Sequence, residues 1–170
     1  KSLLNENRIL NRIQTLLVNG YQTSGNLFDI KNDFTNEIQK AIRFEIEKYR
    51  INFRNSKEGL IKKWPTEYSL YGWLISMKSG GNLNAHIHDY GWLSGSIYIN
   101  VPPKLKADSG NLVVREDNQE FDIKKNSNQK KIIDVVTGSL CLFPSSLYHY
   151  TIPFESKEER IVLAFDVIPK

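Results

Sequence analysis

The chain has 170 residues, of which 40% are hydrophobic and 25% charged, and these proportions suit a globular protein with a substantial core. No apolar run approaches the roughly 18 residues of a membrane span, and the first residues lack the apolar core of a signal peptide, so we expect a cytoplasmic protein without membrane contact. The net charge of +4 is modest and scattered, and residues 124–131 carry lysines without interleaved aromatic residues, which disfavours a nucleic-acid partner.

The only cysteine of the sequence is Cys141. A single cysteine excludes an internal disulfide framework and fits a reducing compartment. Its neighbours at residues 140–143 are apolar, so we expect it to be a small buried side chain. Because residue 1 is Lys rather than Met, we also expect the sequence to be a trimmed domain.

The first third of the chain has the apolar spacing of helices. Residues 2–19 place leucines and isoleucines on one stripe that ends at Gly20, which predicts an amphipathic helix. A second stripe begins after Asn32 or Asp33, either of which is a good N-cap, and continues to about Phe53. We expect both helices to cover a surface of the protein rather than to bind a partner.

Beyond a linker at residues 55–65, apolar residues recur every second position, which is typical of strands. We predict strands at residues 68–78, 84–88, 92–101, 112–116, 121–123, 132–136, 139–143, 147–153 and 160–168, with a turn at residues 80–82. Helices followed by eight or nine strands predict a mainly β (α+β) fold, a cupin-like jelly roll or double-stranded β-helix. We expect a single domain over residues 1–170, in which residues 1–60 form a helical support region packed on one sheet and residues 66–169 form the jelly-roll core.

Side-chain alternation gives a separate indication of a cavity. Along residues 92–101, one face is apolar, whereas the other carries Ser94, Ser96 and Tyr98. On the last strand Arg160 shares its face with the small residues Val162 and Ala164. If this face points inward, the small neighbours leave room for a ligand beside the arginine.

The three histidines of the sequence form the candidate site. His86 and His88 are two residues apart, so on an extended backbone they project to the same side and can bind one metal ion. Two histidines at this spacing, without a third ligand, more often make polar contacts at the protein surface. A third ligand from the distant His149 would complete a cap with open coordination positions, as in catalytic metal sites. Arg160, eleven residues later, offers the fixed cation that an anionic co-substrate beside the metal would need.

These stretches resemble the Fe(II)- and 2-oxoglutarate-dependent oxygenases, and most of all a subgroup of small members with an HxH pair followed by an LSG-x-x-Y strand. The residues that carry the resemblance are His86-Ile87-His88, residues 92–98 and 138–144, His149 and Arg160. The resemblance extends from Trp73 to Pro169, a little over half of the chain.

The resemblance implies Fe(II) and 2-oxoglutarate as cofactors, with His86, His88 and His149 as the metal ligands. The wider family has an aspartate where His88 stands, and Asp89 starts on the opposite strand face. The resemblance further implies that Arg160 binds the 5-carboxylate of 2-oxoglutarate, while Tyr98 is a candidate second donor to it. Some relatives have a serine where this chain has Val162, so a contact from that position to 2-oxoglutarate is missing here.

On this interpretation the protein is a dioxygenase that hydroxylates a small molecule or a peptide and releases succinate and CO₂. Two alternatives remain open: a three-histidine cupin-type dioxygenase that does not use 2-oxoglutarate, and a non-catalytic jelly roll that binds a metal, a carbohydrate or an acidic ligand. Trp73 and Trp92 are candidates for the border of the substrate opening, although large core aromatics are the simpler interpretation. Loops at residues 82–84, 104–111 and 148–154 would set specificity.

Overall fold

The computed structural model describes residues 10–116 and 130–170, so the predicted strand at residues 121–123 lies outside the described residues. In chain order the elements are β1 (Asn11–Arg12), β2 (Leu17–Thr23), the 3-10 helix η2 (Leu27–Asp29), α1 (Asp33–Asn52), α2 (Gly59–Lys62), β3 (Tyr68–Leu83), β4 (Leu93–Asn100), β5 (Leu112–Arg115), β6 (Lys130–Ile133), β7 (Leu140–Pro144), β8 (Tyr148–Thr151) and β9 (Arg160–Pro169). Among the helices of the described residues, none is long and apolar enough to cross a membrane.

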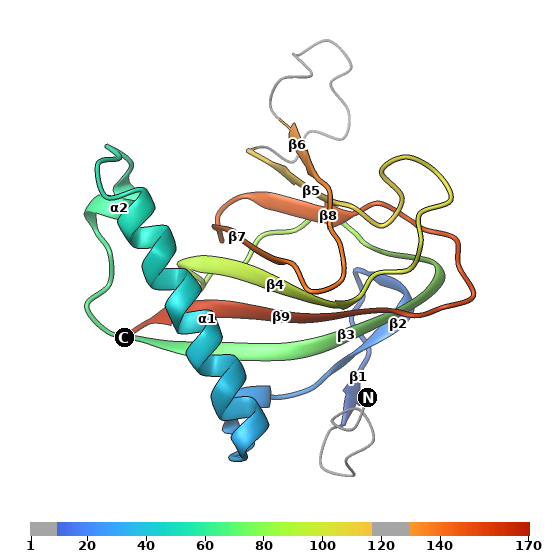
Figure 1. Ribbon diagram of the computed structural model, residues 1–170, viewed down its shortest axis with the longest axis horizontal. Helices are drawn as coiled ribbons and strands as arrows, with labels where there is room; N and C mark the ends of the chain where they lie inside the picture. Colours follow the sequence, from blue (N-terminus) through green and yellow to red (C-terminus); the bar gives the residue numbers. More distant parts are fainter. Residues whose placement is uncertain (1–9, 117–129) are drawn as a thin grey trace.

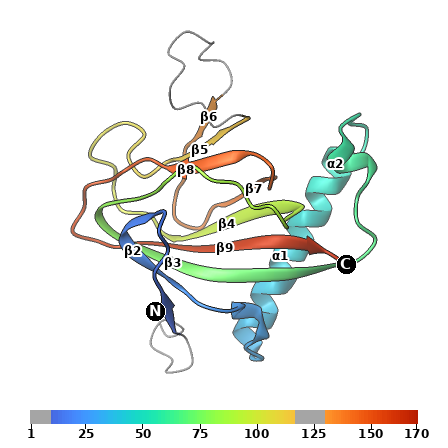
Figure 2. The same cartoon turned by 180° about the vertical axis from the view of Figure 1, so that it is seen from behind.

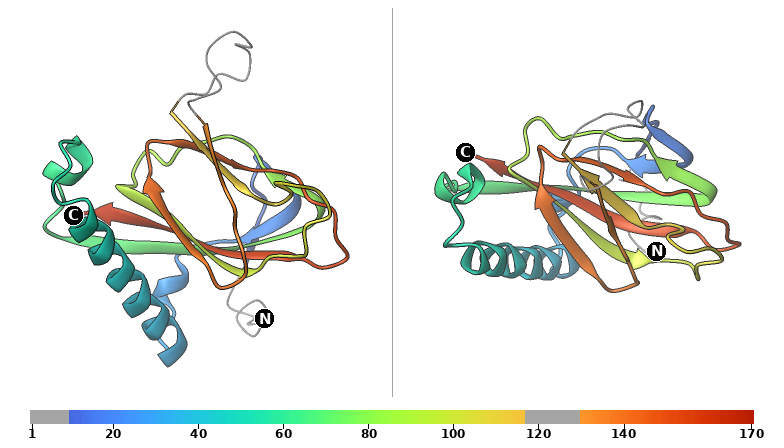
Figure 3. Two further views of the ribbon diagram at one scale, coloured as in Figure 1. Left: turned by 45° about the horizontal axis from the view of Figure 1, so that its top comes forward. Right: turned by 90° about the horizontal axis from the view of Figure 1, so that it is seen from above.

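The described strands form two antiparallel sheets. The large sheet has the order β1-β2-β3-β9-β4-β7, and the small sheet has the order β6-β5-β8. The small sheet lies over one side of the large sheet, whereas α1 crosses β3, β9 and β4 on the other side, in front of them in Figure 1 and behind them in Figure 2. Figure 3 shows the same layers from two further directions. The predicted mainly β, two-sheet architecture with helical cover on one sheet is confirmed.

Helix α1 begins where the sequence predicts. Asn32 is its N-cap, and the Asn32 side chain accepts a hydrogen bond from the Thr35 backbone N–H at 2.8 Å, as part of a capping box. The buried residues Ile42 and Ile46 carry the apolar stripe of the helix into the main core. There they pack with residues of the large sheet, namely Leu70, Leu74, Leu93, Leu163, Phe165 and Val167. Burial of this stripe fixes one face of the large sheet as core.

The helix predicted over residues 2–19 is wrong for the described part of that range. Residues 11–12 and 17–23 are the strands β1 and β2, and β2 pairs with β3 along one side of the large sheet. A stripe at helical spacing does not exclude a strand when an unpaired sheet edge is available, because the edge offers hydrogen bonds to the whole backbone of the segment. Residues 1–9 lie outside the described part. In the described part of the support region, one long helix is therefore joined by two strands.

The predicted hairpin turn at residues 80–82 is also wrong. Strand β3 continues through both glycines to Leu83, because β2 pairs with it as far as the partners Leu17 and Leu83. The strand predicted at residues 84–88 is reduced to one isolated bridge, between His86 and His149. The histidine pair therefore lies in a loop that crosses from β3 toward the small sheet.

The predicted alternation on β4 is confirmed. Leu93 and Ile97 pack in the core beneath α1, whereas Ser94, Ser96 and Tyr98 line a cavity on the opposite face. The neighbouring strand β9 behaves in the same way, since Arg160, Val162 and Ala164 line this cavity. The cavity is thus the polar interior between the two sheets.

Candidate metal centre

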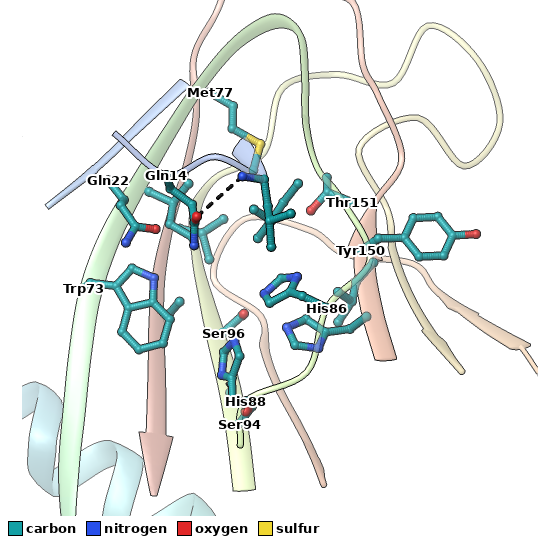
Figure 4. Close-up of a pocket in the computed structure, with 18 of the residues that line it drawn as sticks. Gln14, Gln22, Trp73, Met77, His86, His88, Ser94, Ser96, Tyr150 and Thr151 are labelled. Atoms are coloured by element: carbon teal, nitrogen blue, oxygen red, sulfur yellow. Dashed lines mark hydrogen bonds between the residues drawn. The ribbon is translucent and has the colours of Figure 1, made fainter. Parts of the chain in front are cut away.

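The three histidines come together although they belong to different elements. His86 and His88 lie in the loop after β3, and His149 lies on β8 of the small sheet. The backbones of His86 and His149 hold this arrangement, because each backbone N–H donates to the other's carbonyl oxygen, at 3.2 and 3.0 Å. One ring nitrogen of each histidine lies within 4.8 Å of those of the other two. Figure 4 shows His86 and His88 facing the same pocket, with Trp73 beside them.

Each imidazole has an acceptor at its Nδ1 atom. His86 Nδ1 lies 2.8 Å from the Asn84 carbonyl oxygen, and His149 Nδ1 lies 3.2 Å from that of Leu147. His88 Nδ1 lies 2.7 Å from a carboxylate oxygen of Asp166. These acceptors assign the ring proton to Nδ1 and leave the Nε2 lone pair free, which is the usual state of metal-binding histidines. The donor set therefore fits a divalent metal ion such as iron, which imidazole nitrogens bind well.

The protein environment keeps two of these rings unprotonated. Burial, followed by the nearby His86 and His88 rings, lowers the pKa of His149 to about 3. Burial also lowers the pKa of His86. Neutral imidazoles are the metal-binding form, so at neutral pH these two ligands need not lose a proton before a metal binds.

Arg160 lies in the same cavity and is only 3% exposed. Its Nε atom donates to the Gly110 carbonyl oxygen at 3.2 Å, and its guanidinium carbon lies 5.2 Å from the centre of the Tyr98 ring. No carboxylate of the described residues forms an ion pair with Arg160. A buried charge without a partner is costly, so this position suits an anionic ligand.

Tyr98 is 1% exposed and lies beside Arg160 on the cavity wall. Burial raises the pKa of Tyr98 to about 12. The phenol therefore keeps its proton throughout the neutral range and remains a hydrogen-bond donor. Val162, where some relatives have serine, is buried on the same wall and offers no polar group.

The cavity that contains the histidines, Arg160 and Tyr98 has a volume of about 240 Å³. Part of its wall comes from the N-terminal segment, through Gln14, Leu16 and Gln22. Figure 4 shows Gln14 and Gln22 on this side of the pocket. Gln14 and Leu16 were not expected here because the sequence predicts them on a helix, and Gln22 follows that predicted helix in a segment with no expected role at the site.

Of the other residues that the sequence analysis singled out, some lie at the cavity and others do not. Trp73 lines the cavity, with its ring centre 5.6 Å from that of His88. Trp92 instead donates its indole N–H to the Leu60 carbonyl oxygen and packs against the core beneath α1, so it does not border the cavity. Asp89 is exposed and does not belong to the histidine cluster. Cys141 packs beside the core between the sheets, but it is half-buried rather than fully buried as expected.

A second hollow of about 390 Å³ adjoins the first at His88. The two share Gln22, Trp73 and His88. The outer hollow is lined by Arg12 and by two exposed aromatic residues, Tyr71 and Tyr90. His88 and Trp73 thus stand between a deep cavity with a buried cation and a more open, aromatic hollow.

Two facing sheets, a histidine cluster with free lone pairs and a buried cation define a jelly-roll protein with a candidate metal centre. The sequence model of the 2OG-Fe(II) oxygenase family matches residues 71–166, more than half of the chain, and the chain belongs to this family. Membership confirms the resemblance and implies Fe(II) and 2-oxoglutarate as cofactors of an oxidoreductase. A search of curated protein sequences gave no match.

Solved structures confirm the double-stranded β-helix fold. A prolyl hydroxylase from Trichoplax adhaerens, in complex with a peptide of hypoxia inducible factor, superposes with a TM-score of 0.64 at 14% identity, over 98% of this chain and 73% of that one. A Pseudomonas putida prolyl-4-hydroxylase gives 0.59 at 13% identity, over 95% and 77%. HygX from Streptomyces hygroscopicus, with nickel and 2-oxoglutarate bound, gives 0.57 at 10% identity, over 96% and 74%. At such identities the likeness concerns the fold alone.

Proposed function

We propose that this protein, as one domain over residues 1–170, is an Fe(II)- and 2-oxoglutarate-dependent dioxygenase that hydroxylates a small molecule or a peptide. The observation that carries the proposal is that one cavity contains both three histidines with free Nε2 lone pairs and a buried arginine that has no ion pair with any described residue. The metal accounts for the first feature and a dianionic co-substrate for the second.

His86, His88 and His149 would hold the iron through Nε2. Three neutral ligands leave the ion with its full charge of +2, and 2-oxoglutarate, a dianion, balances that charge. With Fe(II) and 2-oxoglutarate bound, the chemistry supplied is the coupled reaction in which O₂, 2-oxoglutarate and a C–H bond give succinate, CO₂ and an alcohol. The protein's own part is to position the reactants and to limit access of water.

Arg160 and Tyr98 would bind the 5-carboxylate of 2-oxoglutarate. The guanidinium donates its Nε–H to the Gly110 carbonyl and also contacts the Tyr98 side chain, and these contacts fix the plane of the group. The remaining N–H donors can bind a carboxylate. The Tyr98 hydroxyl stays protonated and can donate to the same carboxylate. A charge-assisted contact of this kind offsets the cost of keeping Arg160 buried.

The primary substrate would reach the metal from the outer hollow. This hollow opens beside His88, on the far side of Trp73 from the buried arginine, and its aromatic wall of Tyr71 and Tyr90 suits the flat or apolar face of a substrate. The two solved complexes differ in what they bind: one holds a peptide, whereas HygX has been solved with hygromycin B. Both a peptide and a small molecule therefore stay within the proposal.

The test is succinate release by the iron-loaded protein, measured by mass spectrometry. We expect succinate only when Fe(II), O₂ and 2-oxoglutarate are all present, and none above background from His149→Ala or Arg160→Ala. Arg50→Ala is the matched control for the arginine, since Arg50 is an exposed residue of α1 paired with Glu47. Oxygen uptake that is indifferent to 2-oxoglutarate would instead support the cupin-type dioxygenase. Ligand binding without turnover, under any metal, would support a non-catalytic jelly roll.

A further inference from the structure

Asp166 is a buried carboxylate directly behind one of the three histidines. It lies on β9 with 9% of its surface exposed, and its Oδ1 atom accepts a hydrogen bond from His88 Nδ1 at 2.7 Å and another from the Ser94 hydroxyl at 2.7 Å. No lysine or arginine of the described residues pairs with it. Its one charged or chargeable partner there is the imidazole of His88.

The position of Asp166 is fixed from several sides. In the sheet, Asp166 is the register partner of Ser94 on β4. The Ser94 hydroxyl lies 2.9 Å from that of Ser145, and the Ser145 carbonyl accepts from the His88 backbone N–H at 3.1 Å. The chain also approaches closely at Gly91, where a Cβ atom would lie 2.4 Å from the Ser145 hydroxyl oxygen and 3.4 Å from the Asp166 carboxyl carbon. The loop, both serines and the carboxylate therefore form one packed unit.

The three histidines differ in what stands behind them. His86 and His149 donate to backbone carbonyls, whereas His88 donates to a carboxylate. His88 also occupies the position at which the wider family carries an aspartate. We infer that Asp166 is a positioning residue for the metal, which supplies through His88 the negative charge that a directly bound carboxylate would have brought. The inference rests on the proposed function only in so far as the three histidines bind a metal.

The physical effect of this contact has two parts. A carboxylate hydrogen-bonded to Nδ1 holds the ring in one orientation and makes Nε2 a stronger ligand, and loss of such a partner commonly weakens metal binding 10- to 100-fold. In addition, a buried carboxylate without a cationic partner is costly, and a metal ion bound to the other side of the ring offsets that cost. Asp166 thus favours the occupied site over the empty one.

The experiment is a titration of the metal-free protein with Co(II), followed by absorption spectroscopy and calorimetry, for wild type and Asp166→Asn. The asparagine keeps the shape of the side chain and removes its charge. We expect Co(II) affinity to fall about 10- to 100-fold, with a shifted Co(II) absorption band. Thermal unfolding of the metal-free protein should change little. Glu159→Gln is the matched control, because Glu159 is a half-buried carboxylate that bonds to Ser76 and not to a histidine. Its affinity should equal that of wild type.

A double-mutant cycle separates a role through His88 from a general structural role. In a His88→Ala background, Asp166→Asn should cause no further loss of Co(II) affinity. If Asp166→Asn does not fold, Ser94→Ala tests the same contact more mildly, and we expect it to weaken Co(II) binding by a smaller factor. Affinity of Asp166→Asn within twofold of wild type, or equal losses with and without His88, would overturn the inference. Tight Co(II) binding by a wild type that releases no succinate would refute the proposed function and leave this test standing.

Discussion

Arg160 and Asp166 stand six residues apart on the same face of β9, and both are buried without an ion pair to each other. Along a strand this separation corresponds to roughly 20 Å. Arg160 lines the deep cavity and Asp166 the outer hollow, and of the three histidines only His88 lines both hollows. One strand therefore carries a cation and an anion to opposite ends of the candidate site. Arg160 has no ion pair with a described residue and is open to an anionic ligand, whereas Asp166 contacts the imidazole of His88.

Replacement of Arg160 by methionine tests whether its guanidinium serves ligand binding rather than folding. Because the guanidinium has no carboxylate partner among the described residues, we expect the metal-free Arg160→Met protein to be as stable as wild type or more stable in thermal unfolding. Its affinity for 2-oxoglutarate in calorimetry should fall by about 2–4 kcal/mol, since a buried charge contact is lost. Arg50→Met should change neither quantity. A strongly destabilised Arg160→Met protein would show that the arginine serves the fold instead.

The Tyr98 hydroxyl is tested by Tyr98→Phe. We expect the dissociation constant for 2-oxoglutarate to rise by roughly tenfold, as one hydrogen bond to a charged group contributes about 1.5 kcal/mol. Since the pKa of Tyr98 is raised to about 12, the ratio between variant and wild type should stay constant from pH 6 to pH 9. An unchanged dissociation constant would leave Arg160 as the sole proposed contact of the 5-carboxylate.

Acid should destabilise the metal-free protein through His149. Its pKa is about 3 in the folded protein and about 6.5 in the unfolded chain, so below pH 6.5 the unfolded state binds more protons than the folded one. The free energy of unfolding is therefore highest above pH 6.5 and falls as the pH is lowered toward 3. Between pH 6.5 and 4.5 we expect a loss of roughly 2–3 kcal/mol from this residue, measured by urea denaturation.

The matched variant for this pH series is His149→Gln, which cannot take up the proton. Its unfolding free energy should depend less steeply on pH over the same interval, by about one bound proton. Parallel curves for wild type and variant would contradict the assignment of a buried, neutral imidazole at position 149.

The packing of the large sheet against α1 is tested at Gly95. A Cβ atom at this position would lie between 2.3 and 2.8 Å from three atoms of the Phe165 ring, and Phe165 is fully buried in the core. We expect Gly95→Ala to lower the free energy of unfolding by about 1–3 kcal/mol, since a packed core accommodates extra volume poorly. Gly59→Ala is the control, because an added Cβ at Gly59 meets nothing within 4 Å. That variant should be neutral or slightly stabilised in the same denaturation experiment.

Much of the candidate site could be read from the sequence because it depends on local periodicity. Two-residue alternation put Tyr98 and Arg160 on inward faces, and the structure has both on the cavity wall. The HxH spacing and the distant His149 predicted a cluster, and the rings do cluster. Their binding of iron stays a prediction. Asp166 was missed, although one acid within the apolar run of β9 was a visible signal.

The sequence by itself determined the mainly β architecture, the helix that begins close after Asn32 and the faces of β4 and β9, since these follow from residue type and spacing along a few neighbouring positions. Only the tertiary structure decided that residues 17–23 form a strand, that β3 runs through both glycines, and that Asp166 stands behind His88. Each of these depends on pairing between segments far apart in the chain, and the free energy of such pairing lies in hydrogen bonds and burial that no local pattern contains.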